Sequence, residues 1–272
     1  MGHSSTVVAS LAPRRPVCNP RPVEIGRVRI AEMAVETSAI AVNLARVRER
    51  IARAAEHAGR DPAEITLVAV SKTFPAAAIR EAYAAGVRHF GENRVQEWEA
   101  KHPLVADLAA TWHLVGHLQT NKARRAARLF HTVDSLDSWK LAQKLDAAVA
   151  ELAASGPRRE VVLPVLIEVR LAPEETKHGV EPEELPALAE AVLGLRHLEL
   201  RGLMCIPPLL VDPEQVRPYF RRLRTLRDDL QQRLGRPLPE LSMGMSHDFE
   251  VAIQEGATQV RLGTAIFGAR AS

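Results

Sequence analysis

The 272-residue chain is poor in cysteine, in aromatic side chains and in net charge. Its two cysteines, Cys18 and Cys205, offer no disulfide framework and are typical of the reducing cytoplasm, where we expect the protein. Only 4% of residues are aromatic, and 36 basic residues nearly balance 33 acidic ones, so we expect no nucleic-acid partner. No apolar run approaches the ~18 residues of a membrane span, so we expect no membrane partner either.

The first 32 residues differ in composition from the rest of the chain. They contain proline-rich stretches at 13–16 and 20–22 and show no helical or strand periodicity. We therefore predict a disordered N-terminal extension over 1–32 and one folded domain over 33–272. The extension lacks the apolar core of a secretory signal. A transit peptide, a myristoylated Gly2 and a true start at Met33 are the alternatives left open.

From residue 38 onward, helical and strand patterns alternate. An amphipathic helix is predicted over 38–59, and later helices over 76–85, 95–101, 121–129, 138–154, 183–193, 212–234 and 247–255. Short apolar runs predict eight strands at 65–71, 89–93, 111–115, 131–135, 161–169, 198–206, 241–245 and 259–264. Strict alternation predicts a parallel sheet with helical crossovers. Eight such units favour a single closed (β/α)₈ barrel with an additional N-terminal helix, in which chemistry lies at the C-terminal ends of the strands.

The first predicted strand leads directly into Lys72. Side chains alternate along a strand, so Lys72 shares a face with Val68 and Val70. A lysine at the open end of a buried strand can lose its proton and attack a carbonyl, as Schiff-base lysines do. From this run alone, a solvated lysine is the more common outcome.

The last two predicted strands end in small and polar residues. Ser246 can cap the helix predicted from His247 or donate to a phosphate, while Gly263 and Thr264 let backbone N–H groups approach an anion. Barrels commonly bind phosphate at the loops after strands seven and eight. Arg261 shares a face with Gly263, so it either enters the barrel mouth beside that loop or packs outward on a helix. Simple capping and turn formation are the alternatives for the serine and glycines.

Further polar residues follow the other strands. Asn93 ends the second strand and can contact a ligand there. His113 and His117 lie four residues apart, but on a strand and turn, and no third ligand is evident, so we do not favour a metal site. The loop 177–179 either closes over a ligand or is simply solvated, and we favour the second interpretation.

Several segments, matched in order along the chain, resemble the pyridoxal-phosphate homeostasis proteins, which are related to the barrel domain of alanine racemase. These segments are 69–73, 91–97, 112–122, 177–179, 201–207, 241–246 and 260–270. The resemblance implies a barrel that holds pyridoxal 5'-phosphate as an aldimine on Lys72. It also implies a phosphate site at Ser246, Gly263 and Thr264, a pyridine-facing Arg261, and Asn93 near the ring. The chain departs from the usual pattern at Arg170, His117 and His247.

Three functions are compatible with these motifs. We favour a non-catalytic protein of intracellular cofactor homeostasis, a monomer that makes transient contact with pyridoxal-phosphate-dependent apoenzymes. An amino-acid racemase needs an acid/base on each face of the substrate carbon. In related racemases, a second domain supplies a tyrosine; we expect none here, because Tyr83 and Tyr219 fall on predicted outer helices. A phosphosugar-type barrel enzyme would use the phosphate loops but gives no reason for Lys72.

Overall fold

The computed structural model describes residues 1–3, 38–156, 162–172 and 178–269. The chain divides into two units, Met1–Glu36 and Thr37–Ser272. Of the first unit, only residues 1–3 are described, so the extension predicted over 1–32 lies almost wholly outside the described residues. Lys177 of the predicted polar loop also lies outside them.

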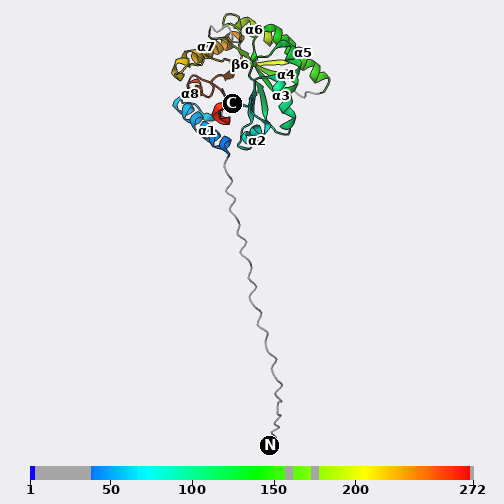
Figure 1. Cartoon of the computed structure of the whole chain (residues 1–272), viewed down its shortest axis with the longest axis vertical. Helices are drawn as coiled ribbons and strands as arrows, with labels where there is room; N and C mark the ends of the chain where they lie inside the picture. The colour runs from blue at the N-terminus through cyan, green and yellow to red at the C-terminus, as the bar shows by residue number, and fades with distance from the viewer. Residues whose placement is uncertain (4–37, 157–161, 173–177, 270–272) are drawn as a thin grey trace. The chain divides into compact units, whose positions relative to one another are not determined.

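Eight parallel strands close into a barrel in sequence order, with β8 paired to β1 (Figure 1). The predicted (β/α)₈ barrel is therefore confirmed. The strands are β1 (Thr66–Val70), β2 (His89–Glu92), β3 (Thr111–Leu114), β4 (Thr132–Leu136), β5 (Leu163–Glu168), β6 (Leu198–Met204), β7 (Glu240–Ser242) and β8 (Gln259–Leu262).

Helices surround the strands (Figure 1). The α-helices are α1 (Ala39–His57), α2 (Ala76–Ala84), α3 (Val95–Lys101), α4 (Ala123–Leu129), α5 (Trp139–Ala154), α6 (Leu185–Leu193), α7 (Arg217–Leu234), α8 (Phe249–Gln254) and α9 (Thr264–Phe267). Single 3₁₀ turns cover Pro62–Glu64, His102–Leu104, Thr120–Lys122 and Pro213–Val216. In the part of the chain that the structure describes, no helix has the length and apolar character to cross a membrane.

The additional N-terminal helix is also confirmed. Ser38 begins α1 as predicted, because its hydroxyl accepts the Ala41 N–H at 3.2 Å. The apolar face of α1 packs on α8 and α9 beside the start and end of the barrel. Arg50 Nε donates to Glu250 Oε1 of α8 at 2.6 Å. This helix therefore covers the region where the first and last strands meet.

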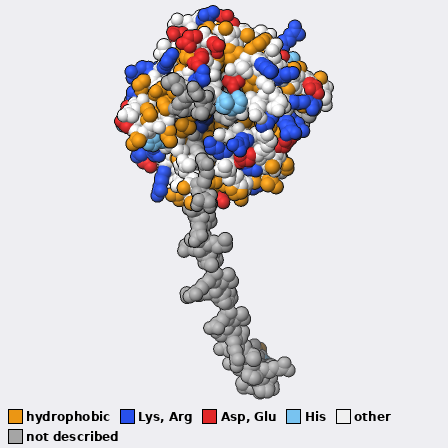
Figure 2. All heavy atoms as spheres, turned by 45° about the horizontal axis from the view of Figure 1, so that its top comes forward, with side chains coloured by type: hydrophobic (Ala, Val, Ile, Leu, Met, Phe, Trp, Pro, Cys, Tyr) orange, Lys and Arg blue, Asp and Glu red, His pale blue; other side chains and the backbone are white. Residues whose placement is uncertain are grey.

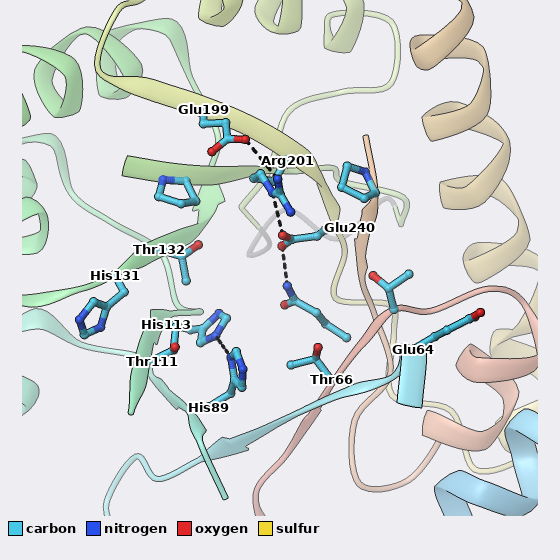
Figure 3. Close-up of a pocket in the computed structure, with 14 residues that line it drawn as sticks. Glu64, Thr66, His89, Thr111, His113, His131, Thr132, Glu199, Arg201 and Glu240 are labelled. Carbon is cyan, nitrogen blue, oxygen red and sulfur yellow. Dashed lines mark hydrogen bonds and ion pairs between the residues drawn. The ribbon is translucent and has the colours of Figure 1, made fainter. Parts of the chain in front are cut away.

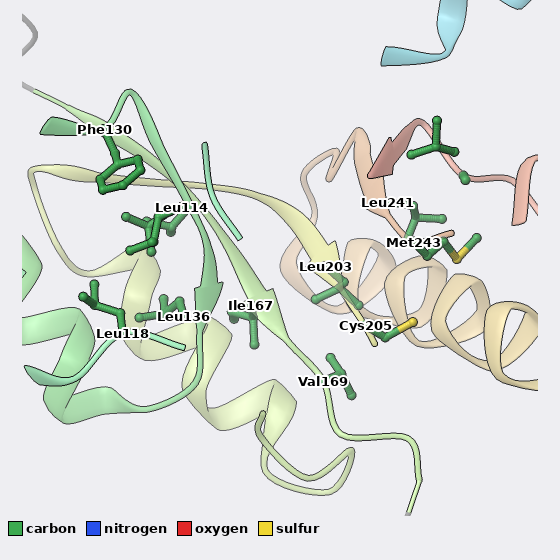
Figure 4. Close-up of a cluster of buried hydrophobic side chains, with 14 of the residues drawn as sticks. Leu114, Leu118, Phe130, Leu136, Ile167, Val169, Leu203, Cys205, Leu241 and Met243 are labelled. Atoms are coloured by element: carbon green, nitrogen blue, oxygen red, sulfur yellow. The ribbon is translucent and has the colours of Figure 1, made fainter. Parts of the chain in front are cut away.

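The main apolar core lies between the strands and the helices (Figure 4). Each of the strands β3 to β7 contributes a fully buried side chain to this core. In strand order these are Leu114, Leu136, Ile167, Leu203 and Leu241. Each such side chain contributes about 1.5–3 kcal/mol relative to exposure. This layer uses one face of each strand, which leaves the other face for the barrel interior.

Several predicted boundaries are wrong at strand and helix ends. Strand five ends at Glu168 and strand seven at Ser242 rather than at 169 and 245. The helix predicted from His247 begins at Phe249, because the Asp248 carboxylate accepts the Met245 N–H at 2.7 Å and holds residues 245–248 in a turn. The short helix α9 was not predicted.

Candidate functional site

The residues singled out from the sequence gather at the C-terminal ends of four consecutive strands. Val70 pairs with Gly91 of β2, and Ala69 pairs with Leu262 of β8. Lys72 and Asn93 follow the first pair, and Gly263 follows the second. Since β7 borders β8, the turn that carries Ser246 completes the group. Parallel pairing thus brings residues from 72 to 264 to one edge of the barrel.

Two valines show which face of β1 looks into the barrel. A Cβ atom added to Gly91 would lie 3.2 Å from a Val68 methyl and 3.3 Å from a Val70 methyl. These valines are absent from the core cluster shared with the helices, whereas Ala69 between them belongs to it. Lys72 follows Val70 by two residues, the spacing that repeats one strand face, and it is half-buried.

The turn that carries Lys72 is held by charged neighbours. Thr73 has φ 67, a left-handed conformation that costs a residue with a side chain roughly 1 kcal/mol or more. Its N–H donates to Glu97 Oε1 at 2.5 Å, and Lys101 Nζ donates to the Ser71 carbonyl at 3.0 Å. The surrounding structure therefore imposes this turn on the chain.

A buried acid supports the same turn. Glu92 is fully buried, and its Oε1 accepts from Ser71 Oγ at 2.8 Å and from Lys101 Nζ at 2.6 Å. Burial raises the Glu92 pKa, although the hydrogen bond from Lys101 opposes the rise. Sequence reasoning missed this support; the signal was an acidic residue inside the apolar second strand.

Arg261 points into the barrel rather than outward. It pairs with Val68, whose side chain faces the interior, and only 4% of the arginine is exposed. Its guanidinium donates to Ser242 Oγ and to the Cys205 carbonyl, both at 2.8 Å. Burial lowers its pKa from the usual value. The structure thus favours the inward alternative.

Ser246 faces the chain segment after β8 and does not cap α8. Its Oγ accepts the N–H groups of Gly263 at 3.3 Å and Ala265 at 3.2 Å. The N-cap position of α8 belongs to Asp248. Thr264 is exposed beside this turn. The Ser246 hydroxyl and two backbone N–H groups therefore lie together, which is the composition expected of a phosphate site.

Asn93 lines a cavity of about 210 Å³ at the same end of the barrel. Gly116 is required there, because an added Cβ would lie 2.4 Å from the Asn93 carbonyl oxygen. Glu168 also lines the cavity with only 4% of its surface exposed, and burial raises its pKa to about 7. Arg170, which follows this strand and departs from the usual family pattern, forms an ion pair with Glu181.

The two histidines that lie four residues apart belong to different clusters. His113 is buried, with its Nδ1 3.1 Å from Asp134 Oδ2 and its Nε2 3.0 Å from His89 Nδ1. His117 is at the mouth, with its Nδ1 3.0 Å from Asp137 Oδ2. His113 and His117 therefore contact different side chains, and His117 has neighbours that the sequence did not reveal.

A separate pocket of about 660 Å³ lies at the N-terminal end of the strands (Figure 3). His89 and His113 face it, and Arg201 bridges Glu199 and Glu240 at 3.1 and 3.0 Å. The residues that line it include no lysine. This pocket is therefore distinct from the residues gathered around Lys72.

Comparisons with known proteins agree with this architecture. The family described as alanine racemase, N-terminal domain, matches residues 42–271. Solved alanine racemases share the fold at low identity: the Clostridium difficile enzyme is 16% identical with a TM-score of 0.64, over 86% of this chain and 57% of that one. The chain thus has an alanine-racemase-type barrel.

More similar relatives define the family. The pyridoxal phosphate homeostasis proteins of Aquifex aeolicus and Pseudomonas aeruginosa are 50% and 51% identical over 84% and 86% of this chain and 96% of each relative. Synechococcus elongatus PipY, solved with pyridoxal phosphate bound, is 43% identical with a TM-score of 0.74, over 84% of this chain and all of that one. The chain belongs to the pyridoxal phosphate homeostasis protein family.

Proposed function

We propose that this protein binds pyridoxal 5'-phosphate and takes part in homeostasis of that cofactor. The observation that carries the proposal is the convergence of three features on three consecutive strands: the strand-end Lys72, the inward Arg261, and an anion-type turn formed by Ser246 and Gly263. The bound cofactor in the 43% identical PipY structure supports it. The cofactor supplies an aldehyde, a pyridine ring and a phosphate, and the chain offers a group suited to each.

In this proposal each residue has a stated task. The Lys72 amine attacks the cofactor aldehyde, water leaves, and a C=N bond (an aldimine) remains. Ser246, Gly263 and Thr264 hold the phosphate. Arg261 keeps its charge toward the pyridine nitrogen, which disfavours protonation of that nitrogen and weakens the ring as an electron sink. Asn93 lies beside the ring.

We further propose that the protein holds the cofactor without catalytic turnover. Tyr83 and Tyr219 lie on the outer helices α2 and α7, packed against the hydrophobic core. Neither supplies the second acid/base that racemisation requires. Glu168, whose pKa is about 7 and which lines the mouth cavity, is the one observation that favours the alternative of an amino-acid racemase.

Absorption spectroscopy tests cofactor binding. After incubation with pyridoxal phosphate and removal of the unbound cofactor, the protein should show an aldimine band that Lys72→Ala abolishes. Lys140→Ala, at an exposed position in α5, is the matched control and should retain the band. A colourless wild type would contradict both the homeostasis and the racemase functions.

Exchange of the amino-acid α-deuterium separates those two functions. The homeostasis proposal predicts no loss of deuterium above the rate given by the free cofactor. Loss at an enzymatic rate, abolished by Glu168→Gln, would establish the racemase alternative.

The remaining proposals concern partners, cellular location and domain bounds. We propose a monomer in the cytoplasm that makes transient contact with pyridoxal-phosphate-dependent apoenzymes, and an ordered domain over 33–272. Basic and acidic side chains are interspersed across the face of the molecule seen in Figure 2.

A further inference from the structure

Three side chains with metal-binding atoms converge at the barrel mouth. His117 follows β3, Asp137 follows β4, and His178 lies in the segment before α6. One ligand atom from each lies within 4.8 Å of the other two. Among the described residues, no other group of three histidines, cysteines or acids meets that spacing. The site therefore joins residues that are 61 positions apart in the sequence.

Within the cluster, a hydrogen bond joins His117 to Asp137, whereas His178 contacts His117 by ring stacking. Asp137 accepts from His117 through Nδ1, at 3.0 Å. The His178 ring stacks on the His117 ring, with centroids 3.6 Å apart and planes 10° apart.

The ligand set indicates the class of ion. Two imidazoles and one carboxylate suit zinc, which is bound by three protein ligands and an open fourth position in many sites. Hard ions such as calcium and magnesium prefer all-oxygen sites. The open side faces the 210 Å³ cavity, because His117 and His178 line it together with Asn93.

Binding requires a small rearrangement. A metal ion lies in the plane of each imidazole that binds it, so two parallel stacked rings cannot share one ion. Tetrahedral zinc with bonds of about 2.1 Å also needs ligand atoms about 3.4 Å apart. His117 and His178 are both exposed, so either ring can turn out of the stack. Histidine side chains reach the surface on the face seen in Figure 2.

We propose that His117, Asp137 and His178 bind one divalent transition-metal ion, preferentially zinc, at the mouth of the barrel. The ion joins the ends of β3 and β4 to the segment before α6 and lies beside Asn93. This proposal does not depend on cofactor binding, because none of its three ligands is among the groups assigned to the cofactor.

Zinc titration against a chromophoric chelator tests the site, using the full chain after removal of unbound cofactor. The wild type should bind one zinc ion that competes with the chelator. His117→Ala, His178→Ala and Asp137→Asn should each weaken binding by about tenfold or more. His57→Ala, which removes an exposed histidine at the end of α1, is the matched control and should leave affinity unchanged.

Two results would overturn the proposal. One is a wild type that binds zinc no more tightly than a variant carrying all three substitutions. The other is a zinc affinity in His178→Ala equal to that of the wild type. All variants should retain the cofactor absorption band, so a loss of zinc binding accompanied by a normal band excludes unfolding. Loss of the band in every protein, with zinc binding intact, would instead contradict the proposed function alone.

Discussion

At the scale of single residues, the Ser246 hydroxyl sits at the centre of the anion-type turn. It accepts two backbone N–H groups, one from Gly263 after β8 and one from Ala265 in the first turn of α9. A phosphate at this turn would interact with the hydroxyl and with the same backbone donors, whereas the aldehyde and ring would not. The affinity for the phosphorylated cofactor is therefore expected to depend on Ser246, and the affinity for its dephosphorylated form is not.

Ser246→Ala tests that difference. The variant should weaken binding of pyridoxal phosphate by roughly 10- to 150-fold, because one hydrogen bond to a charged group contributes about 1.5–3 kcal/mol. Binding of pyridoxal, which lacks the phosphate, should change little. Equilibrium dialysis with both compounds measures the two affinities. Equal weakening of both would place Ser246 away from the phosphate.

The site residues differ in how readily the sequence reveals them. Strand alternation placed Lys72 on the face of Val68 and Val70 and Arg261 on the face of Gly263, but it left open whether either side chain is solvated or points inward. The contact between Glu92 and Lys101 was not predicted, since it depends on how α3 packs against the turn after β1. The cluster of His117 with His178 depends on the path of a loop, which no local pattern specifies.

At the scale of elements, the contact between β6 and β7 depends on a glycine. A Cβ added to Gly202 would lie 1.8 Å from the Glu240 carbonyl oxygen, a distance that no real contact tolerates. These strands carry the Cys205 carbonyl and Ser242, both of which accept from Arg261. The spacing of the two strands therefore also positions the arginine.

Gly202→Ala should lower the free energy of unfolding by roughly 1–3 kcal/mol or more, because the backbone must shift to admit the methyl group. Chemical denaturation monitored by circular dichroism measures the change. Gly194→Ala is the matched control: Gly194 has φ −76, and its nearest contact would be 3.3 Å away. A Gly202 variant as stable as the control would show that the strands lie further apart.

Element order was predictable, whereas element ends were not. The alternation of apolar runs identified all eight strands because both faces of each are buried. Strand seven ended three residues early because Gly244, with φ 92, turns the chain before the predicted end. The following helix began late because Asp248 bonds to the backbone of Met245. Such side-chain-to-backbone contacts are not visible in periodicity.

At the scale of the whole molecule, buried acids make stability depend on pH. Burial raises the Glu168 pKa from 4.5 to about 7, despite the charge of Arg261. The unfolded chain gives up this proton near pH 4.5, while the folded chain keeps it to about pH 7. The folded state is therefore favoured below pH 4.5, and this advantage is lost as pH rises to about 7.

Glu168→Gln should remove that part of the pH dependence. The difference between the two pKa values corresponds to at most about 3 kcal/mol. The free energy of unfolding is measured for the cofactor-free wild type and variant from pH 4.5 to about 7. As the pH rises over this range, the value for the wild type should fall relative to that of the variant. Parallel curves would indicate that Glu168 ionises normally in the folded protein.

The most direct test of the proposed function is to ask which lysine, if any, binds the cofactor covalently. Borohydride reduction of the cofactor-loaded protein converts the imine to a stable amine, and peptide mass spectrometry then locates it. We predict a single modified residue, Lys72, and no modification at Lys101, which is engaged with Glu92. Modification at another lysine, or none in a protein that retains the cofactor, would contradict the account.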